Sequence, residues 1–364
     1  MISGEVTKDN NYWLGHPDTC VFKNKIYVCY RKSFQHLSEK NTEICVTHSD
    51  LSNINFNNSY ISFSVEGRLN CPRLYSEDGV MYLICDMIPS SGDFISSENG
   101  PNTRICLWKT DNGILWDGPI ITNIYGIVPS KPVKNKNGKY LIASHTKKYF
   151  LKKDNSIINI NNKKDFSSLY AKEEISGYLI QNLWISDSLF SNKWVGPIRV
   201  ADKRNFNFCE ASLFCIDQNI IGCMMRENSR RGEPSFYCLS NDGGMSWSEL
   251  YKTRMYGCHR PVVGQLRSGS WLTTYREQKY STNKKYWAKN TIACLSEKDD
   301  WNPKNSFVHS ISLNIDHDRN RSNPDSGYTG WVQLNDDKIF IVNYITDCYD
   351  RPYIKYYLIE ENDF

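Results

Sequence analysis

The sequence lacks any long run of apolar residues. No stretch approaches the roughly 18 residues that a membrane-spanning helix needs. The first residues, from Met1 to Val6, are largely polar and do not resemble a signal peptide. We therefore expect neither a membrane span nor a secretory leader.

Paired metal-ligand motifs are missing as well. The chain has 13 cysteines and 7 histidines, yet it contains no Cys-x-x-Cys and no His-x-x-x-His spacing. A zinc site has little support, and we expect neither a metal nor an organic cofactor. An odd number of cysteines, most of them in apolar strand-like runs, would mispair under oxidising conditions. We interpret them as reduced core residues, which predicts a cytoplasmic protein, although export by another route stays open.

The chain also has no strong excess of charge. Its 44 basic and 40 acidic residues give a net charge of +4, and the basic residues are scattered. A nucleic acid is therefore not expected as the main partner, whereas an anionic small molecule is allowed. Hydrophobic residues make up 40% and aromatic residues 13% of the chain, which suits many short half-buried strands better than a large helical core.

One local motif stands out among the residues that are present. Residues 240–247 match the pattern Ser-x-Asp-x-Gly-x-Ser/Thr-Trp, known as an Asp box. The glycine permits a tight turn, Asp242 can accept hydrogen bonds from the amides of that turn, and Trp247 can pack beneath it. Residues 111–116 resemble a second box that lacks its serine, because Lys109 stands at that position. We interpret both boxes as structural turns within four-stranded units.

The chain contains six such units. Each has a strand, a tight hairpin, a second strand that ends in a polar residue, and a third strand that ends near a tryptophan or a box remnant. From the first residue of a unit to the end of its second strand the spacing is 14, 15 or 16 residues. The units cover residues 14–60, 68–120, 128–200, 207–252, 257–312 and 325–362. An insertion at about 149–176, rich in lysine and asparagine, predicts a flexible loop in the third unit.

Repeats of this length with about four short strands favour a propeller over a sandwich. The expected fold class is all-β: a six-bladed β-propeller of four-stranded antiparallel blades. One domain then spans residues 1–364, and the segment Val6–Leu14 can supply a strand that closes the ring. The sequence does not predict an oligomeric state.

In a propeller the innermost strands line a central channel, so the starts of these strands meet at one mouth. Aligning the six units places at these starts His16, Cys71, Lys131, Glu210, Arg260 and Tyr328. Asp18 and Arg73 follow two residues later, on the same strand face. The ends of the second strands add Arg31, Asp86, His145, Arg226, Arg276 and Tyr344. Each alone could be an ordinary ion-paired or packed residue, but together they predict a site for an acidic ligand.

The Asp boxes, the six units and the series Glu210, Arg226, Arg260 and Tyr328 resemble the sialidase (neuraminidase) superfamily. That resemblance implies an arginine clamp for the carboxylate of a 2-keto sugar acid, a tyrosine nucleophile activated by a glutamate, and an aspartate that protonates the leaving group. By position, Tyr328 would be the nucleophile and Glu210 the activating base, with Arg226 and Arg260 in the clamp.

The first unit departs from the family pattern. His16-Pro17-Asp18 stands where the family has Arg-Ile-Pro, so the third clamp arginine is expected to be Arg73 or Arg31. Asn343-Tyr344 stands where many members have a glutamate. The blade-one loop offers His36 but no aspartate, which leaves Asp18 as the expected acid and Asp86 as its substitute. Arg276, His16, His36 and Tyr344 are further expected contacts of the substrate.

Three functional hypotheses follow. The first is a retaining exo-glycosidase that hydrolyses α-ketosides of a 2-keto-3-deoxy sugar acid, such as sialic acid, another nonulosonic acid or Kdo, within a glycoconjugate or polysaccharide. The second is a propeller that binds such a sugar acid without cleaving it. The third is another carbohydrate-active propeller, a lyase or a neutral-sugar hydrolase that uses Asp18 and Glu210, but a neutral substrate would leave the arginines unexplained.

Overall fold

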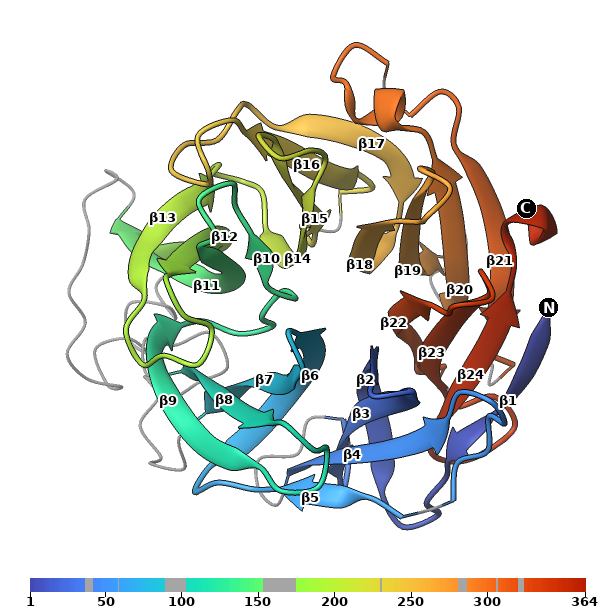
Figure 1. Cartoon of the computed structure of the whole chain (residues 1–364). Coiled ribbons are helices and arrows are strands. Elements are labelled where there is room, and N and C mark those ends of the chain that lie inside the picture. The colour runs from blue at the N-terminus through green and yellow to red at the C-terminus, as the bar shows by residue number, and fades with distance from the viewer. Residues whose placement is uncertain are drawn as a thin grey trace.

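Six four-stranded sheets surround a central axis (Figure 1). The structure, a computed structural model, describes residues 1–36, 42–57, 59–88, 103–152, 175–229, 231–280, 287–305, 307–319 and 324–364. All neighbouring strands in these sheets pair antiparallel. The chain is a six-bladed β-propeller, which confirms the predicted fold class.

Blades one to three follow one another around the ring. Blade one contains β2 (Trp13–Phe22), β3 (Lys25–Ser33), β4 (Glu43–Asp50) and β5 (Ile61–Phe63). Blade two contains β6 (Arg68–Glu77), β7 (Val80–Ile88), β8 (Arg104–Thr110) and β9 (Asp117–Tyr125). Blade three contains β10 (Val133–Lys134), β11 (Tyr140–Lys152), β12 (Ile175–Ser186) and β13 (Val195–Ala201).

Blades four to six complete the circle. Blade four contains β14 (Phe208–Cys215), β15 (Ile221–Glu227), β16 (Pro234–Ser240) and β17 (Tyr251–Tyr256). Blade five contains β18 (Cys258–Gln265), β19 (Trp271–Tyr280), β20 (Trp287–Ser296) and β21 (Ile311–His317). Blade six contains β22 (Ser326–Gln333), β23 (Ile339–Ile345), β24 (Tyr353–Ile359) and β1 (Ile2–Thr7). Two short 3-10 helices are η2 (Lys298–Trp301) and η3 (Glu361–Asp363).

The N-terminal strand β1 closes the ring by joining the last blade. It pairs antiparallel with β24, from Ile2 opposite Leu358 to Thr7 opposite Ile354. The predicted closing segment, Val6–Leu14, is displaced toward the C-terminus. The observed strand begins at Ile2 and ends at Thr7, whereas Trp13 and Leu14 already belong to β2. The signal for β1 is weak, since Val6 is its only fully buried large apolar side chain.

The apolar faces of adjacent blades pack against one another and form the core. Between blades four and five, Phe214 lies against Trp301 with ring centroids 4.3 Å apart, and Trp271 and Tyr237 enclose the same pair. All 13 cysteines are free; Cys215 and Cys348 are exposed and the others are buried. Among the described residues, no helix is long and apolar enough to cross a membrane.

The octet at 240–247 forms a tight turn between β16 and β17. Asp242 accepts hydrogen bonds from the amides of Met245 and Ser246 at 3.0 and 2.9 Å. In the second box Asn112 takes the place of the aspartate and accepts from the amide of Ile114 at 2.8 Å. Thr110 takes the place of the serine, and its hydroxyl accepts from the amide of Gly113 at 2.9 Å. The second box is therefore one residue shorter, and its serine counterpart is Thr110, not position 109.

A left-handed residue recurs near the start of each innermost strand. His16, Cys71, Glu210 and Arg260 have φ angles of 54°, 36°, 50° and 48°. At each of these residues the pairing with the second strand shifts by one position, as in a β-bulge. A bulge bends the strand and redirects a side chain, and a non-glycine residue in this region costs about 1–2 kcal/mol. The bulge therefore gives each blade one side chain aimed differently from the rest of its strand.

The bulges also define the true register of the repeat. In blade six the left-handed residue is Gly327, so Tyr328 follows the repeat position instead of occupying it. In blade three it is Val128, with φ of 52°, so the predicted Lys131 is three residues too late. Val128 precedes a proline, as His16, Cys71 and Arg260 do, but the Lys-Pro pair that follows produced the wrong alignment.

The predicted insertion separates β11 from β12. These strands pair as far as Lys152 opposite Ile175, so regular strand extends into both ends of the predicted loop. Residues 153–174, on which the prediction of flexibility falls, lie outside the described residues.

Ring closure by β1 predicts an unequal response to two truncations on that strand. Val6→Ala should lower the free energy of unfolding by about 2 kcal/mol, because Val6 is buried against blades one and six. Ile2→Ala, the matched control, should change it by less than about 0.5 kcal/mol, because Ile2 is 62% exposed. Urea titration of both variants measures the difference. Equal effects would contradict the role of β1 in the core.

Candidate active site

The centre of the candidate site is a hydrogen bond between a tyrosine and a glutamate from different blades. The hydroxyl of Tyr328, on β22, donates to Oε1 of Glu210, on β14, at 2.5 Å. Glu210 is the bulge residue of blade four, which turns its side chain toward blades five and six. Its other oxygen accepts from the amide of Arg260 at 3.0 Å. The carboxylate is thus held on both oxygens, and the tyrosine hydroxyl is its partner on one of them.

Two arginines converge on the same hydroxyl. Arg226, at the end of β15, places Nη1 3.2 Å from the Tyr328 oxygen and 2.9 Å from Glu210 Oε1. Arg276, on β19, places Nη2 3.2 Å from the same tyrosine oxygen. The guanidinium of Arg260 lies 5.2 Å from the centre of the Tyr328 ring and is fully buried. Arg276, expected only as a substrate contact, thus reaches Tyr328 as closely as Arg226 does.

Burial and charge fix the resting protonation states of the pair. Burial alone would raise the pKa of Glu210, but Arg226 and Arg276 lower it to about 2. Burial and then the Glu210 carboxylate raise the pKa of Tyr328 above its ordinary range. At neutral pH the glutamate is therefore ionised and the tyrosine is neutral, with its proton directed at the glutamate.

Three buried histidines beside the arginines are neutral. Burial, followed by nearby positive charge, holds the pKa of His16 and of His259 well below the usual range, and burial lowers that of His145 to about 4. Nδ1 of His259 accepts from Arg276 at 2.8 Å, and Nδ1 of His145 accepts from the amide of Glu210 at 3.3 Å. The ring of His16 stacks on Tyr328 with centroids 5.2 Å apart. These residues position the site without adding charge to it.

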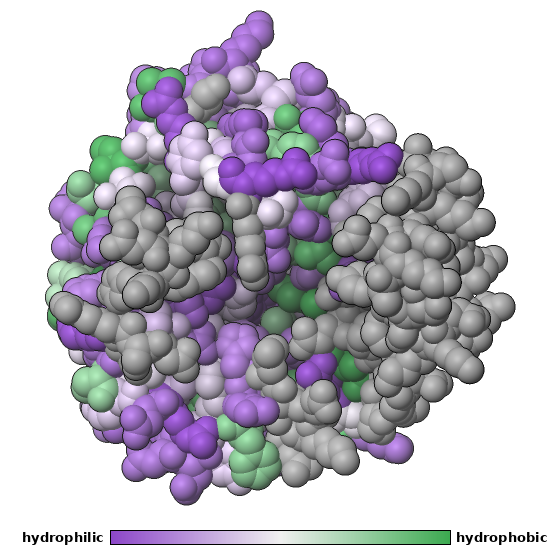
Figure 2. Space-filling view, turned by 180° about the vertical axis from the view of Figure 1, so that it is seen from behind, coloured by the Kyte–Doolittle hydropathy of each residue, from purple (hydrophilic) through white to green (hydrophobic). Residues whose placement is uncertain are grey.

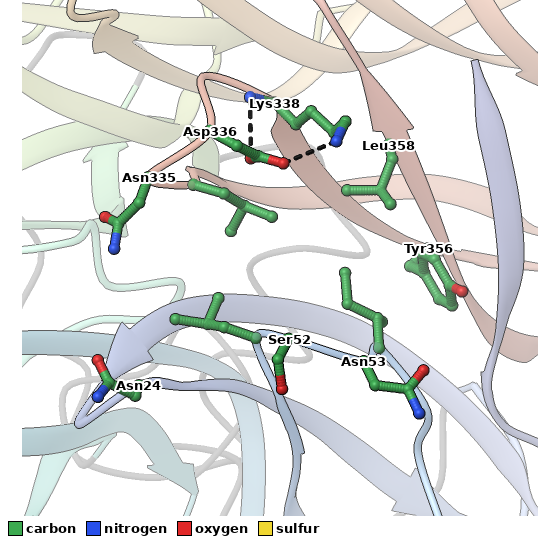
Figure 3. A pocket seen from close by; sticks show the side chains of 11 residues that line it. Asn24, Ser52, Asn53, Asn335, Asp336, Lys338, Tyr356 and Leu358 are labelled. Carbon is green, nitrogen blue, oxygen red and sulfur yellow. Dashed lines mark hydrogen bonds and ion pairs between the residues drawn. The ribbon is translucent and has the colours of Figure 1, made fainter.

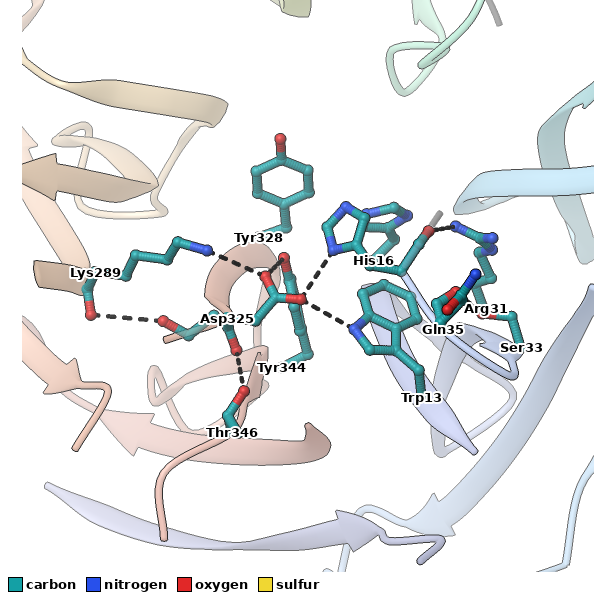
Figure 4. A network of polar contacts seen from close by, with 12 residues as sticks. Trp13, His16, Arg31, Ser33, Gln35, Lys289, Asp325, Tyr328, Tyr344 and Thr346 are labelled. Carbon is teal, nitrogen blue, oxygen red and sulfur yellow. Dashed lines mark hydrogen bonds and ion pairs between the residues drawn. The ribbon is translucent and has the colours of Figure 1, made fainter. Parts of the chain in front are cut away.

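A second network surrounds Asp325, just before β22 (Figure 4). Its Oδ2 accepts from Trp13 Nε1 at 2.9 Å and from His36 Nδ1 at 2.8 Å. Its Oδ1 accepts from the Tyr344 hydroxyl at 2.9 Å and from Lys289 Nζ at 3.3 Å. Burial would raise the pKa of Asp325, but His36 and Lys289 hold it well below the ordinary range. Asp325 is therefore an ionised carboxylate with all of its lone-pair directions used.

The two expected acids lie elsewhere. Asp18 is fully buried, accepts from the amide of Leu74 at 2.9 Å and lies 3.1 Å from Lys131 Nζ. Asp86 is also fully buried and accepts from the amide of Val128 at 3.3 Å. Both carboxylates connect parts of different blades: Asp18 joins blade one to blade two and to the segment before β10 of blade three, and Asp86 joins blade two to that same segment.

The two expected third arginines also have structural contacts. Arg73 donates from Nε to the carbonyl of Pro129 at 3.0 Å. Burial and then Arg260 lower the pKa of Arg73 to about 10. Arg31 donates to the carbonyl of His36 at 2.9 Å and to Asn70 at 3.2 Å. Arg31 therefore holds the segment that carries His36.

Several cationic nitrogens beside Tyr328 are buried and have no hydrogen-bond partner among the described residues. They are Nε of Arg226, Nε of Arg276, and Nε and Nη1 of Arg260. Nε2 of the neutral His16 is likewise buried and has no hydrogen-bond partner among the described residues. Unpaired buried donors of this kind are costly unless a ligand or water accepts from them. The group is suited to an anion that brings several acceptor oxygens.

Sequence reasoning missed Asp325, Lys289, Trp13 and His259. Asp325 lies two residues before the bulge of blade six and Trp13 three before that of blade one, so a search window that began earlier on the first strands would have included both. His259 directly precedes Arg260. Lys289 lies on a third strand, β20, and the repeat carries no signal for it.

Figure 2 shows the face opposite to that of Figure 1, with a hollow near its centre where polar and apolar residues meet. A different pocket of 810 Å³ lies between blades one and six (Figure 3). Hairpin residues such as Asn24, Asn335 and Asp336 line it, and it contains none of the candidate site residues. Within the described part of the chain, no three His, Cys, Asp or Glu side chains are grouped so that they could hold a metal ion.

No protein-family model and no curated protein matches the sequence. Solved structures do match. A protein of unknown function from Dyadobacter fermentans aligns over 98% of this chain and 97% of its own, with a TM-score of 0.74 and 14% identity. The Hadza microbial sialidase Hz136 aligns over 97% and 66%, with a TM-score of 0.63 and 13% identity. The NanB sialidase of Streptococcus pneumoniae aligns over 99% and 70%, with a TM-score of 0.61 and 12% identity.

The fold is that of the sialidases. At such low identity the likeness concerns the fold and not the chemistry. This chain covers 66% of the length of the Hadza enzyme and 55% of that of the Trypanosoma rangeli sialidase, so both of those proteins contain further segments.

The ionised state of Glu210 predicts a pH-dependent contribution to stability. A carboxylate whose pKa is lowered on folding stabilises the protein above its unfolded pKa, and this contribution is lost as the pH falls through the folded value. The wild type should therefore lose on the order of 3 kcal/mol relative to Glu210→Gln between pH 4.5 and about 2.

Urea denaturation at several pH values within this window measures that difference. Glu249→Gln, at an exposed site, is the control, and its difference from the wild type should stay flat. A difference for Glu210→Gln that is constant with pH would show that the folded protein does not keep Glu210 ionised.

Proposed function

We propose that this protein is a sialidase-like exo-glycosidase that hydrolyses the α-ketosidic bond of a 2-keto-3-deoxy sugar acid. The observation that carries the proposal is the 2.5 Å hydrogen bond from Tyr328 to Glu210, with Arg226 and Arg276 both within 3.2 Å of the tyrosine oxygen. A buried tyrosine rarely needs one carboxylate and two guanidinium groups for packing. This arrangement suits a nucleophile whose negative charge develops during the reaction.

The arginines favour an anionic substrate. Arg226, Arg260 and Arg276 present buried nitrogens that no described residue accepts from. A carboxylate next to the anomeric carbon can accept from such donors in a charge-assisted, bidentate manner. A 2-keto sugar acid carries this carboxylate, whereas a neutral sugar would leave the donors unpaired.

The choice of nucleophile follows from the same charge. A substrate carboxylate beside the anomeric carbon would repel a carboxylate nucleophile, but it does not repel a neutral tyrosine. As the Tyr328 oxygen bonds to the anomeric carbon, its proton passes to Glu210 along the existing hydrogen bond. Arg226 and Arg276 then stabilise the charge on the tyrosine oxygen when the covalent intermediate is hydrolysed. Two displacements at one carbon retain its configuration.

The first experiment is turnover of a panel of 4-methylumbelliferyl α-ketosides of sialic acid, related nonulosonic acids and Kdo. The native protein should release the fluorophore from at least one of them. Tyr328→Phe should lower kcat/KM at least about 10³-fold, because the nucleophilic oxygen is gone. Tyr237→Phe is the matched control, since its buried hydroxyl has no partner among the described residues.

One observation favours a second function, which is binding of a sugar acid without cleavage. His16, neutral and fully enclosed, stands where the family resemblance implies an arginine of the clamp. A clamp reduced in this way suits a propeller that binds the sugar acid without cleaving it. No turnover across the panel, together with saturable binding of a free acid in calorimetry, would favour this function over hydrolysis.

The clamp itself can be tested by binding. Arg276→Met should weaken the binding of a free 2-keto sugar acid about 10- to 100-fold, because it removes a charge-assisted hydrogen bond from a buried site. Arg267→Met, on the same blade but paired with Asp337 at the surface, should leave affinity unchanged. Calorimetric titration of both variants measures the effect. Equal affinities would exclude Arg276 from the clamp.

A further inference from the structure

The candidate site contains a partly exposed acid–base group that the proposed nucleophilic step does not use. This group is His36, whose side chain is 42% exposed, whereas the Asp325 side chain beside it is 12% exposed. Nδ1 of His36 lies 2.8 Å from Asp325 Oδ2. None of the described residues hydrogen-bonds to Nε2 of His36, which is therefore the nitrogen able to meet a ligand.

Asp325 fixes the orientation of the imidazole. Its own position is set by Trp13, Tyr344 and Lys289, so the carboxylate cannot turn away from His36. A carboxylate that accepts from one ring nitrogen of a histidine selects the tautomer, and it stabilises the imidazolium when the other nitrogen is protonated. This pairing is the usual arrangement of a histidine that transfers protons during catalysis.

The backbone beside His36 is also held in place. The carbonyl of His36 accepts from Arg31 at 2.9 Å, and the carbonyl of Phe34 accepts from Arg351 at 2.5 Å. The Ser33 hydroxyl donates to the carbonyl of Gln35 at 3.0 Å. The segment that follows β3 is thus fixed at three successive carbonyls, and His36 is presented from a defined position in spite of its exposure.

His36 faces the nucleophile across one intervening ring. The His36 and His16 rings lie 5.5 Å apart, and the His16 ring stacks on Tyr328 at 5.2 Å. The indole of Trp13 packs against both histidines, with centroids 4.8 Å from His36 and 5.2 Å from His16. His36 thus lies one ring away from Tyr328 and is far more exposed than it, so a leaving group that departs toward solvent can pass His36.

We propose that His36, oriented by Asp325, is the general acid and base of this site. The proposal rests on the proposed function, and it gives to His36 the role that the sequence suggested for Asp18. In the first step the bond between the anomeric carbon and the leaving oxygen breaks. That oxygen keeps the electron pair and takes the proton from Nε2 of His36, while Tyr328 bonds to carbon and its proton passes to Glu210.

The second step reverses these transfers. A water molecule gives a proton to Nε2 of the now neutral His36, and its oxygen bonds to the anomeric carbon. The bond from carbon to the Tyr328 oxygen breaks, and Tyr328 recovers its proton from Glu210. The net reaction is hydrolysis, with every group returned to its starting state. Asp325 keeps its charge throughout and acts as a positioning residue.

The test compares two glycosides of the same sugar acid. A 4-nitrophenyl glycoside releases a stable phenolate and needs little protonation, whereas a methyl glycoside cannot leave without a proton. His36→Gln should lower kcat/KM for the methyl glycoside at least about 10²-fold and that for the nitrophenyl glycoside less than about 5-fold. His48→Gln, on β4 of the same blade, is the control and should change neither.

Asp325→Asn extends the test to the positioning residue. It should show the same selective loss on the methyl glycoside, whereas a purely structural role would lower both rates together. If the Asp325 variant fails to fold, the selective loss of kcat/KM in His36→Gln still tests the role of His36 as the acid. An equal loss on both glycosides in His36→Gln, or no loss on either, overturns the proposal. If the native protein hydrolyses neither glycoside, the proposed function fails and the acid fails with it.

Discussion

The site depends on one backbone feature that recurs in all six blades: a left-handed residue near the start of the innermost strand. In four blades this residue is not a glycine or a valine but carries a polar or charged side chain or a thiol, namely His16, Cys71, Glu210 and Arg260. Each costs about 1–2 kcal/mol of backbone strain. Without the bulge, strict alternation would set the direction of these side chains. With it, Glu210 reaches Tyr328 and Arg260 reaches across the axis to the carbonyl of Pro72.

The electrostatic design follows from that convergence. Five arginines around the candidate site are nearly or fully buried: Arg31, Arg73, Arg226, Arg260 and Arg276. Burial of like charges is unfavourable unless partners of opposite charge compensate for it. Glu210 and Asp325 supply two such partners, each ionised in the folded protein. The neighbouring histidines stay neutral, so they fill space and accept hydrogen bonds without adding to the repulsion. Positive charge remains in excess beside Tyr328, where Arg226, Arg260 and Arg276 keep buried nitrogens without a partner among the described residues.

The sequence predicted the fold well because the propeller repeats itself. Hairpin turns, Asp-box turns and strand lengths are local properties, and six copies in register reinforce one another. Errors arose where the repeat is imperfect. In blade three a lysine–proline pair follows the true position at Val128-Pro129 and displaced the alignment, and in blade six Gly327, which has no side chain and adopts a left-handed conformation easily, concealed the register. Partners such as Asp325 and Lys289 depend on contacts between distant segments, and no single-strand pattern contains that information.

The pairing of β1 with β24 has a consequence for how the protein is made. A ribosome delivers Ile2–Thr7 before the other strands of the propeller and Tyr353–Ile359 after them, so the ring cannot close until the last of these strands has emerged. Tyr328, on the same blade as β24, follows Glu210 by 118 residues and can reach it only after that stretch has emerged. A nascent chain therefore carries the carboxylate and its arginine long before the tyrosine joins them. The contact between Tyr328 and Glu210 needs both blade four and blade six, so a product that ends before blade six lacks it.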